Sequence, residues 1–184
     1  MVDLKAFEKS FLASHIKEGG VCCDFTMGNG HDTLWLSHAV GERGRVYAFD
    51  IQPLALESTE KTLSEGGAYN NVTLILDSHS NAVNYVHEKI CAGVFNLGYL
   101  PGSDKKITTM RETTMKAVRD AVSMLDDDGI VLIAVYPGHA EGTAEGEMLL
   151  SNLSSEYDRR TYCVSLFKII NSPTSPFVIS VEKK

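Results

Sequence analysis

The stretch Val21-Cys22-Cys23-Asp24-Phe25-Thr26-Met27-Gly28-Asn29-Gly30-His31-Asp32 decides the fold of this chain. A short apolar run ends in an acidic residue, passes into a Gly-x-Gly turn and continues into residues 33–36, which begin a helix. A strand, a tight turn and a helix N-terminus in this order direct backbone N–H groups and the positive end of the helix dipole at a ligand. Because glycine has no Cβ, Gly28 and Gly30 let the backbone approach that ligand closely. The turn therefore predicts a cofactor site.

The glycine turn departs from the dinucleotide-binding fingerprint, which needs a third glycine three residues after the second. Thr33 stands at that position, so the sequence does not support a pyrophosphate-binding turn. Asp24, just before the turn, favours a ligand with positive charge or several hydrogen-bond donors, such as the amino and sulfonium groups of S-adenosylmethionine. The alternative at this point is an ordinary βα turn that uses glycine only for tightness.

Composition suits one globular domain over residues 1–184, because 43% of the residues are hydrophobic and 22% are charged. The net charge of −7 argues against nonspecific binding of nucleic acid through a basic surface, although a nucleic-acid substrate stays open. Solvated surface charge is the common explanation of short basic clusters. The clusters that could instead form a local basic patch are Lys105-Lys106 with Arg111, and Arg159-Arg160.

The four cysteines lack the CxxC spacing of a zinc site, so we expect small buried hydrophobic residues and no metal. No apolar run reaches membrane-spanning length, and the first residues lack the layout of a signal peptide. The sequence therefore predicts a cytoplasmic protein with no membrane partner.

Helical and strand-like patterns alternate along the chain, which predicts an α/β fold with a Rossmann-like, doubly wound sheet. The sheet is expected to be mostly parallel, with an antiparallel closing strand formed by the last two segments. The run 130–136 is the strongest strand pattern, since its apolar residues suit burial on both faces. The expected helices are 4–17 (an N-terminal helix within 1–18), 33–40, 53–64, 81–89, 108–125 and 141–153, and the other expected strands are 21–24, 45–50, 72–76, one beginning at 93, 162–170 and 177–181.

The second expected strand also ends in an acidic residue, Asp50, about 20 residues past the glycine turn. At that separation a carboxylate meets the ribose of a nucleotide in a doubly wound sheet, and Gln52 offers a further donor and acceptor. The alternative is a solvated strand end or an N-cap for the helix that Pro53 starts. Ser78 and His79 follow the third strand and should reach the same edge, near the adenine.

Polar and aromatic residues also follow the next two strands, in the stretches 96–99 and 136–139. Ligands of an open parallel sheet bind outside the carboxyl ends of its strands, so these side chains should face the cofactor. The string Asn96-Leu97-Gly98-Tyr99 is similar to the Asn/Asp-Pro-Pro-Tyr/Phe loop of amino-group methyltransferases, with Leu-Gly in place of the two prolines, so the match is partial.

Taken together, these segments resemble class I S-adenosylmethionine-dependent methyltransferases, and within them the YtqB-like family once labelled rRNA methylases. The match runs from the first strand to beyond the fifth. The residues that carry it are 26–33, 46–52, 78–79, 94–102 with 104–105, 107–109, and 136–139 with 141–142.

The resemblance implies S-adenosylmethionine as the cofactor and a tRNA methyltransferase activity. The implied substrate is 5-aminomethyl-2-thiouridine at the wobble position, converted to 5-methylaminomethyl-2-thiouridine, with the tRNA anticodon loop as the partner and a homodimer as a further expectation. One departure is the string His139-Ala140-Glu141-Gly142, where the family usually has His-Pro-Glu-Gly. The similarity implies that the cofactor contacts are Asn29, His31, Asp50, Gln52, Ser78 and His79, to which the turn adds Asp24, Gly28, Gly30 and Asp32.

The chemistry expected from these residues needs no covalent nucleophile, because a neutral amine can attack the sulfonium methyl directly. We expect Asn96, Tyr99 and His139 to be catalytic. Asn96, with the backbone of residues 97–100, would accept hydrogen bonds from the amine, and Tyr99 or Tyr136 would stack on the base. His139 would carry off the proton, with His31 as the alternative. The expected substrate contacts are Leu97, Gly98, Tyr136 and Gly138. Two alternatives stay open: methylation of rRNA or of a small-molecule amine, and a non-catalytic protein that binds a nucleoside or RNA.

Overall fold

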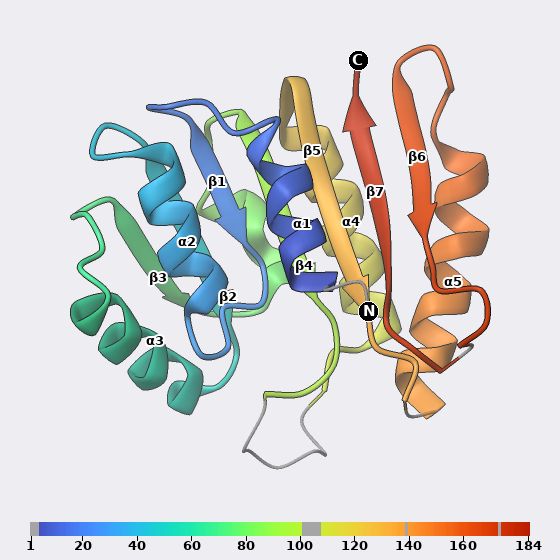
Figure 1. Ribbon diagram of the computed structural model, residues 1–184, viewed down its shortest axis with the longest axis horizontal. Coiled ribbons are helices and arrows are strands. Elements are labelled where there is room, and N and C mark those ends of the chain that lie inside the picture. The colour runs from blue at the N-terminus through green and yellow to red at the C-terminus, as the bar shows by residue number, and fades with distance from the viewer. Residues whose placement is uncertain (1–3, 101–107, 139, 173) are drawn as a thin grey trace.

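The computed structural model describes residues 4–100, 108–138, 140–172 and 174–184, which form a seven-stranded sheet with helices on both faces. The strand order is β3-β2-β1-β4-β5-β7-β6 (Figure 1). The first five strands pair in parallel, and β7 runs antiparallel to both β5 and β6. The strands are β1 (Val21–Asp24), β2 (Arg45–Asp50), β3 (Val72–Leu76), β4 (Ile90–Asn96), β5 (Leu125–Val135), β6 (Tyr162–Phe167) and β7 (Phe177–Lys183).

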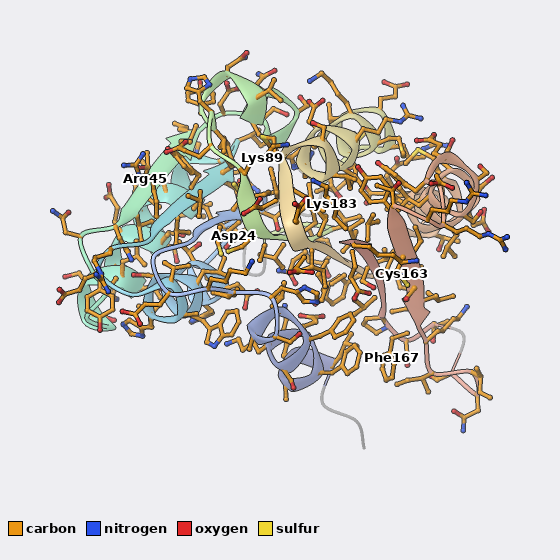
Figure 2. The ribbon with its side chains drawn as sticks, turned by 90° about the horizontal axis from the view of Figure 1, so that it is seen from above. Asp24, Arg45, Lys89, Cys163, Phe167 and Lys183 are labelled. Atoms are coloured by element: carbon orange, nitrogen blue, oxygen red, sulfur yellow. The ribbon has the colours of Figure 1, made fainter. Side chains whose placement is uncertain are left out.

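The helices cover the sheet from two sides. In Figure 2, α1 and α2 lie on one side of the strands, and α4 and α5 lie on the other. None of the helices in the described ranges is long and apolar enough to cross a lipid bilayer. The predicted fold class, a mostly parallel doubly wound sheet with an antiparallel closing pair, is confirmed. The helices are α1 (Leu4–Ala13), α2 (His31–Val40), α3 (Pro53–Glu65), the 3-10 helix η1 (His79–Asn84), α4 (Arg111–Met124) and α5 (Ala140–Glu156).

Two elements differ from their predicted bounds. Strand β5 begins at Leu125 rather than at residue 130, because its first part stays extended beside β4, with a register shift between Ile90 and Ala92. The helix expected over 81–89 is the shorter η1, whose N-cap Ser78 accepts a hydrogen bond from the backbone of Ser80. A side-chain cap at this point starts the helix earlier than the apolar spacing indicated.

The hydrophobic core lies on both faces of the central strands. On one face the rings of Phe25, Phe49 and Phe95 are at most 1% exposed. The centroid of Phe25 lies 4.3 Å from that of Phe95 and 5.9 Å from that of Phe49. Leu12 of α1 and Leu36 of α2 pack on the opposite face. The two layers of helices thus fix the central strands and hold their carboxyl ends in place.

Three of the four cysteines are buried, as the sequence predicts for small hydrophobic residues. The Sγ atoms of Cys22 and Cys91 lie 3.4 Å apart inside the sheet. Cys163 is exposed on β6, so the expectation of burial is wrong for this residue. The strand β6 lies at the edge of the sheet, and none of its residues is fully buried.

The strands β1, β2 and β4 end at the same edge of the sheet, because they run parallel and are in direct register with their neighbours. Asp24 of β1 pairs with Ala48 of β2 and with Val94 of β4. The last residues of β2 and β4, Asp50 and Asn96, therefore extend past the end of β1. The predicted site residues come together at this edge.

Candidate cofactor and substrate site

The glycine turn between β1 and α2 depends on left-handed backbone at two positions. Gly28 has φ 53° and Gly30 has φ 78°, which side-chain-bearing residues rarely adopt. At Gly30 an added Cβ would also lie 2.9 Å from Cα of Thr59 on α3. The second glycine is thus required by close packing between the turn and α3, in addition to any approach of a ligand.

The buried side chain of Asp24 stabilises this turn through hydrogen bonds. Its Oδ1 accepts a hydrogen bond from the backbone N–H of Thr26 at 3.1 Å, and its Oδ2 accepts one from Thr33 Oγ1 at 2.7 Å. The carboxyl group is fully buried. Burial and the neighbouring charge of Asp32 raise its pKa to about 7, although the two hydrogen bonds oppose the shift. The expectation that Asp24 contacts the cofactor is therefore corrected: the residue has no exposed surface and holds the turn instead.

Asp50, at the end of β2, supports the other side of the turn. Its Oδ2 accepts a hydrogen bond from the backbone N–H of Gly28 at 3.2 Å, and its Oδ1 accepts one from that of Gln52 at 3.0 Å. The N-cap of α3 is Gln52 and not Asp50, so the N-cap alternative for Asp50 does not hold. Burial raises the pKa of Asp50, and the backbone donors oppose this shift. The carboxylate is half-buried and keeps lone pairs for the hydroxyls of a ribose.

Three hydroxyl groups of α3, which the sequence analysis did not single out, also hold the turn. Ser58 Oγ donates to Asn29 Oδ1 at 2.9 Å, and Thr62 Oγ1 donates to the Asn29 carbonyl at 2.7 Å. Thr59 Oγ1 donates to the Gly28 carbonyl at 3.1 Å. Thr62 lies four positions after Ser58 and three after Thr59, and these spacings place side chains close together on one side of a helix. That spacing of Ser and Thr is the signal that could have identified them.

The His79 side chain places a hydrogen-bond acceptor, its Nε2, at the carboxyl edge of the sheet. The side chain is 9% exposed, and its Nδ1 lies 3.2 Å from the Phe25 carbonyl oxygen. A carbonyl only accepts, so Nδ1 carries the proton and Nε2 is an acceptor. Within the described residues, Nε2 has no hydrogen-bond partner. Burial lowers the pKa of His79, which keeps the ring neutral and this acceptor available.

Ser78 is the N-cap of η1. Its Oγ lies 2.9 Å from Ser80 Oγ, and its backbone N–H donates to Asp77 Oδ1 at 2.7 Å. Asp77 also accepts hydrogen bonds from Asn81 Nδ2 and Tyr85 Oη, at 3.0 Å and 2.9 Å. The loop after β3 is thus fixed by its own polar groups, with Ser78 beside His79 at the predicted edge.

Asn96 lies at the centre of a polar network at the end of β4. Its backbone N–H donates to Thr26 Oγ1 at 2.7 Å, and its Nδ2 donates to Asp32 Oδ2 at 2.9 Å. Its Oδ1 accepts a hydrogen bond from Lys5 Nζ of α1. The structure therefore brings together the predicted residues Asn96 and Asp32, and it adds Lys5, which the sequence analysis did not identify.

The charge of Lys5 is stabilised by acidic neighbours. Its Nζ lies 3.2 Å from Glu8 Oε2 and 3.3 Å from Asp32 Oδ2. Burial lowers the pKa of Lys5, but Asp32, Glu8 and Tyr136 outweigh burial and raise it above its ordinary value. Burial raises the pKa of Tyr136, and the Lys5 charge opposes this. Lys5 thus remains an ammonium group at the site.

The stretch after Asn96 divides into a buried and an exposed part. Leu97 is 3% exposed, and its N–H donates to the Ala134 carbonyl at 2.9 Å. Its side chain belongs to the core, so the predicted contact of Leu97 with substrate stays a prediction for its backbone alone. Tyr99 is 39% exposed and pairs with Thr108 through an isolated β-bridge. An exposed tyrosine here can offer its ring to a base.

A buried carboxylate on α5 holds the start of this loop. Glu145 is fully buried, and it accepts hydrogen bonds from Thr109 Oγ1 at 2.8 Å and Thr114 Oγ1 at 2.5 Å. Thr109 Oγ1 in turn accepts from the Gly98 N–H at 2.9 Å, and the Thr109 N–H donates to the Gly98 carbonyl at 2.9 Å. Glu145 therefore positions the backbone next to Tyr99.

The other predicted residues are placed as follows. His31 is exposed in the first turn of α2. Gly138 would meet nothing within 4 Å if it carried a Cβ, so its position is open. His139 and the cluster Lys105-Lys106 lie outside the described residues.

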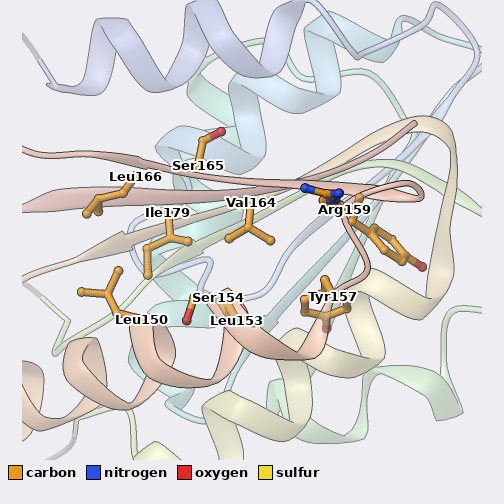
Figure 3. A pocket seen from close by; sticks show the side chains of 10 residues that line it. Leu150, Leu153, Ser154, Tyr157, Arg159, Val164, Ser165, Leu166 and Ile179 are labelled. Carbon is orange, nitrogen blue, oxygen red and sulfur yellow. The ribbon is translucent and has the colours of Figure 1, made fainter.

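A separate cavity of about 380 Å³ lies between α5 and the strands β6 and β7 (Figure 3). None of the predicted site residues lines this cavity. Figure 3 shows apolar side chains such as Leu150, Val164 and Ile179 around it. The cavity is therefore distinct from the edge where the glycine turn, Asp50 and Asn96 meet.

The strand order, the glycine turn and the acidic end of β2 define the class of the protein: it has the class I fold of S-adenosylmethionine-dependent methyltransferases. The chain belongs to the family described as "Putative rRNA methylase", whose model matches residues 46–182. The family predicted from the sequence is confirmed.

One relative is the chloroplastic tRNA (mnm(5)s(2)U34)-methyltransferase of Arabidopsis thaliana, 34% identical over 179 residues. The match covers 92% of this chain and 65% of that protein, so the chain spans about two thirds of the relative's length.

Two solved structures are similar over nearly their whole length. A putative rRNA-methylase from Clostridium thermocellum has a TM-score of 0.96 and 36% identity, over 100% of this chain and 99% of that one. A putative methyltransferase from Streptococcus mutans, solved in complex with SAH, has a TM-score of 0.89 and 36% identity, over the same shares.

Proposed function

We propose that this protein is an S-adenosylmethionine-dependent tRNA methyltransferase that methylates the amine of 5-aminomethyl-2-thiouridine at the wobble position. The observation that carries the proposal is the Asn96 amide, fixed between Thr26 and Asp32 at the edge that also holds Asp50. An amide carbonyl at this place suits an N–H donor on the group to be methylated. The name of the Arabidopsis relative supports the choice of tRNA and of this nucleoside.

The residues at the sheet edge fit S-adenosylmethionine in their donor and acceptor chemistry. Asp50 offers carboxylate oxygens to ribose hydroxyls, and Gln52 lies beside it. The unpartnered Nε2 of His79 is a buried acceptor that suits the exocyclic amine of adenine. The proposed cofactor contacts are Gly28, Asn29, Gly30, His31, Asp32, Asp50, Gln52, Ser78 and His79, with Asp24 supporting the turn from inside.

The proposed chemistry assigns positioning to the protein, while the bound cofactor supplies the methyl group. The Oδ1 of Asn96 accepts an N–H of the substrate amine and turns its lone pair towards the methyl carbon. Tyr99 stacks on the wobble base, which must leave the anticodon loop to reach the site. His139 stays the predicted proton carrier, with the exposed His31 as the alternative. Gly98, Tyr136, Gly138 and the backbone of Leu97 remain proposed substrate contacts.

The proposed RNA partner must be held by few basic groups, because the chain carries a net charge of −7. Arg111 begins α4 close to the substrate loop, and its Nε lies 3.0 Å from Glu141 Oε1. Arg159 lines the separate cavity at the edge of the sheet. Arg111 is therefore the better placed of the two for contact with the anticodon loop. The homodimer and the cytoplasmic location stay predictions.

The experiment that tests the proposal follows labelled methyl groups from S-adenosylmethionine into three pools: tRNA lacking the terminal methyl, ribosomes and small amines. The proposal predicts label in tRNA, recovered as 5-methylaminomethyl-2-thiouridine after digestion. Label found only in ribosomes would favour the second candidate, an rRNA methyltransferase, which the description of the family supports.

A non-catalytic nucleoside-binding protein is distinguished by calorimetry with S-adenosylhomocysteine. Such a protein would bind this compound, would lose binding on Asp50→Ala, and would label none of the three pools. The proposed enzyme shows the same loss of binding on Asp50→Ala together with the loss of tRNA labelling.

A further inference from the structure

The ammonium group of Lys5 on α1 contacts the side-chain carbonyl of Asn96, which binds the substrate amine in the proposed function. Its Nζ donates to Asn96 Oδ1 and lies 3.2 Å from Glu8 Oε2 and 3.3 Å from Asp32 Oδ2. An ammonium has three donors, and these three oxygens give each of them an acceptor. The contact joins residues 91 positions apart in the sequence.

This contact is more than a solvated surface ion pair. The side chain of Glu8 is 3% exposed and that of Asp32 is 20% exposed, so both carboxylates are largely withdrawn from water. Largely buried carboxylates need a cation, because an unpaired charge there is strongly destabilising. Lys9, on the same helix, differs: its Nζ is 4.0 Å from Asp32 and lies 5.8 Å from the centre of the Trp35 ring.

The Lys5 side chain and the proposed substrate present the same chemical group, a primary amine on a methylene carbon. Lys5 is unsuited to act as the base, because the surrounding carboxylates raise its pKa and keep it protonated. Its ammonium also fixes the Asn96 amide: Oδ1 faces the amine position while Nδ2 is bound to Asp32. The amide is thus oriented for an amine before any substrate arrives.

We propose that Lys5 is a built-in competitor of the substrate amine, occupying Asn96 Oδ1 in the free protein and yielding this place to the aminomethyl group of the incoming nucleoside. The inference rests on the proposed function. It also gives a basis for selectivity: an aminomethyl group can replace the Lys5 ammonium as the donor to Asn96 Oδ1, whereas a uridine without the amine has no such donor to displace Lys5.

The test uses Lys5→Met, which keeps the length of the side chain and removes the charge, with Lys9→Met as a matched control on the same helix. The full-length proteins are loaded with S-adenosylhomocysteine and titrated with ethylammonium chloride. The probe is followed through the side-chain amide resonances of Asn96 in ¹⁵N-labelled protein. We expect Lys5→Met to bind ethylammonium about tenfold more tightly than the parent and Lys9→Met, since one charge-assisted hydrogen bond is no longer in competition.

Equal or weaker binding by Lys5→Met, in a variant whose thermal unfolding matches that of the parent, would overturn the inference. A second readout is the KM for amine-bearing tRNA, which should fall in Lys5→Met; a raised KM would show that Lys5 assists the substrate instead. The ethylammonium titration needs no methyl transfer, so failure of the proposed tRNA activity and failure of the competitor role give different results.

Discussion

The hydroxyl of Thr33 donates a hydrogen bond to Asp24 Oδ2 at 2.7 Å, which ties the first turn of α2 to the end of β1. Thr33 stands where a dinucleotide-binding turn would have its third glycine. Both residues are fully buried. In this chain a side-chain hydrogen bond thus replaces the close helix–strand packing that a third glycine allows.

Thr33→Val should therefore destabilise the protein by about 1–3 kcal/mol, because it leaves a buried carboxyl oxygen without its donor. The measurement is urea-induced unfolding followed by circular dichroism. Thr33→Ser keeps the hydroxyl and is the matched control, with a smaller loss expected. No loss in Thr33→Val, or a loss in Thr33→Ser as large as that in Thr33→Val, would contradict the assignment of this stability to the hydrogen bond.

The pH dependence of stability should report Asp24. Its pKa is raised from 3.8 to about 7 in the folded protein, so folding favours the protonated form. This contribution to stability is fully present below pH 3.8 and is lost as the pH rises through about 7. Asp24→Asn, which stays neutral, should lose less stability than the parent between pH 4 and about 7. The difference in the free energy of unfolding between the two proteins, measured across that range, checks the sign. A difference that does not vary with pH would contradict it.

Gly30→Ala should abolish cofactor binding, since the new Cβ would lie 2.9 Å from the Thr59 backbone and would push the turn away from α3. Gly67→Ala is the matched control, because Gly67 has φ 65° but nothing within 4 Å of an added Cβ. Calorimetry with S-adenosylhomocysteine should show binding lost in Gly30→Ala and retained in Gly67→Ala. If both variants bind as the parent does, the packing of the turn on α3 does not shape the site.

Glu145→Gln should impair transfer without weakening cofactor binding. The amide would replace one acceptor by a donor, so one of the hydroxyls of Thr109 and Thr114 loses its partner and the backbone at Gly98 is held less firmly. We expect kcat to fall about tenfold at unchanged affinity for S-adenosylhomocysteine. Glu147→Gln, on the exposed side of the same helix, should leave both quantities unchanged. A parallel loss of cofactor affinity in Glu145→Gln would point to general destabilisation.

Much of the fold and of the cofactor site could be predicted because both depend on local sequence patterns. The alternation of strand and helix patterns gives the parallel sheet, and the position of Asp50 at a strand end gives its place beside the glycine turn. The burial of Asp24 could not be predicted in this way, since a carboxylate at a strand end is exposed or buried according to the helix that packs on it.

The residues that sequence analysis missed act across long separations. Lys5 reaches Asn96 from 91 positions away, and Glu145 reaches Thr109 from 36 positions away. No spacing within either segment indicates these contacts, because they arise only when α1 and α5 pack on the sheet. The hydroxyls of α3 are different, since their spacing on one helix face was visible in the sequence.

The central claim is that a cofactor bound at the glycine turn and an amine held by Asn96 meet at one edge of the sheet. The most direct measurement is single-turnover methyl transfer to tRNA bearing 5-aminomethyl-2-thiouridine, compared between the parent and Asn96→Ala at saturating S-adenosylmethionine. We predict transfer by the parent and a loss of about a hundredfold in Asn96→Ala, with the affinity for S-adenosylhomocysteine retained. Equal rates in the two proteins, or no transfer by a parent that binds the cofactor, would contradict the account.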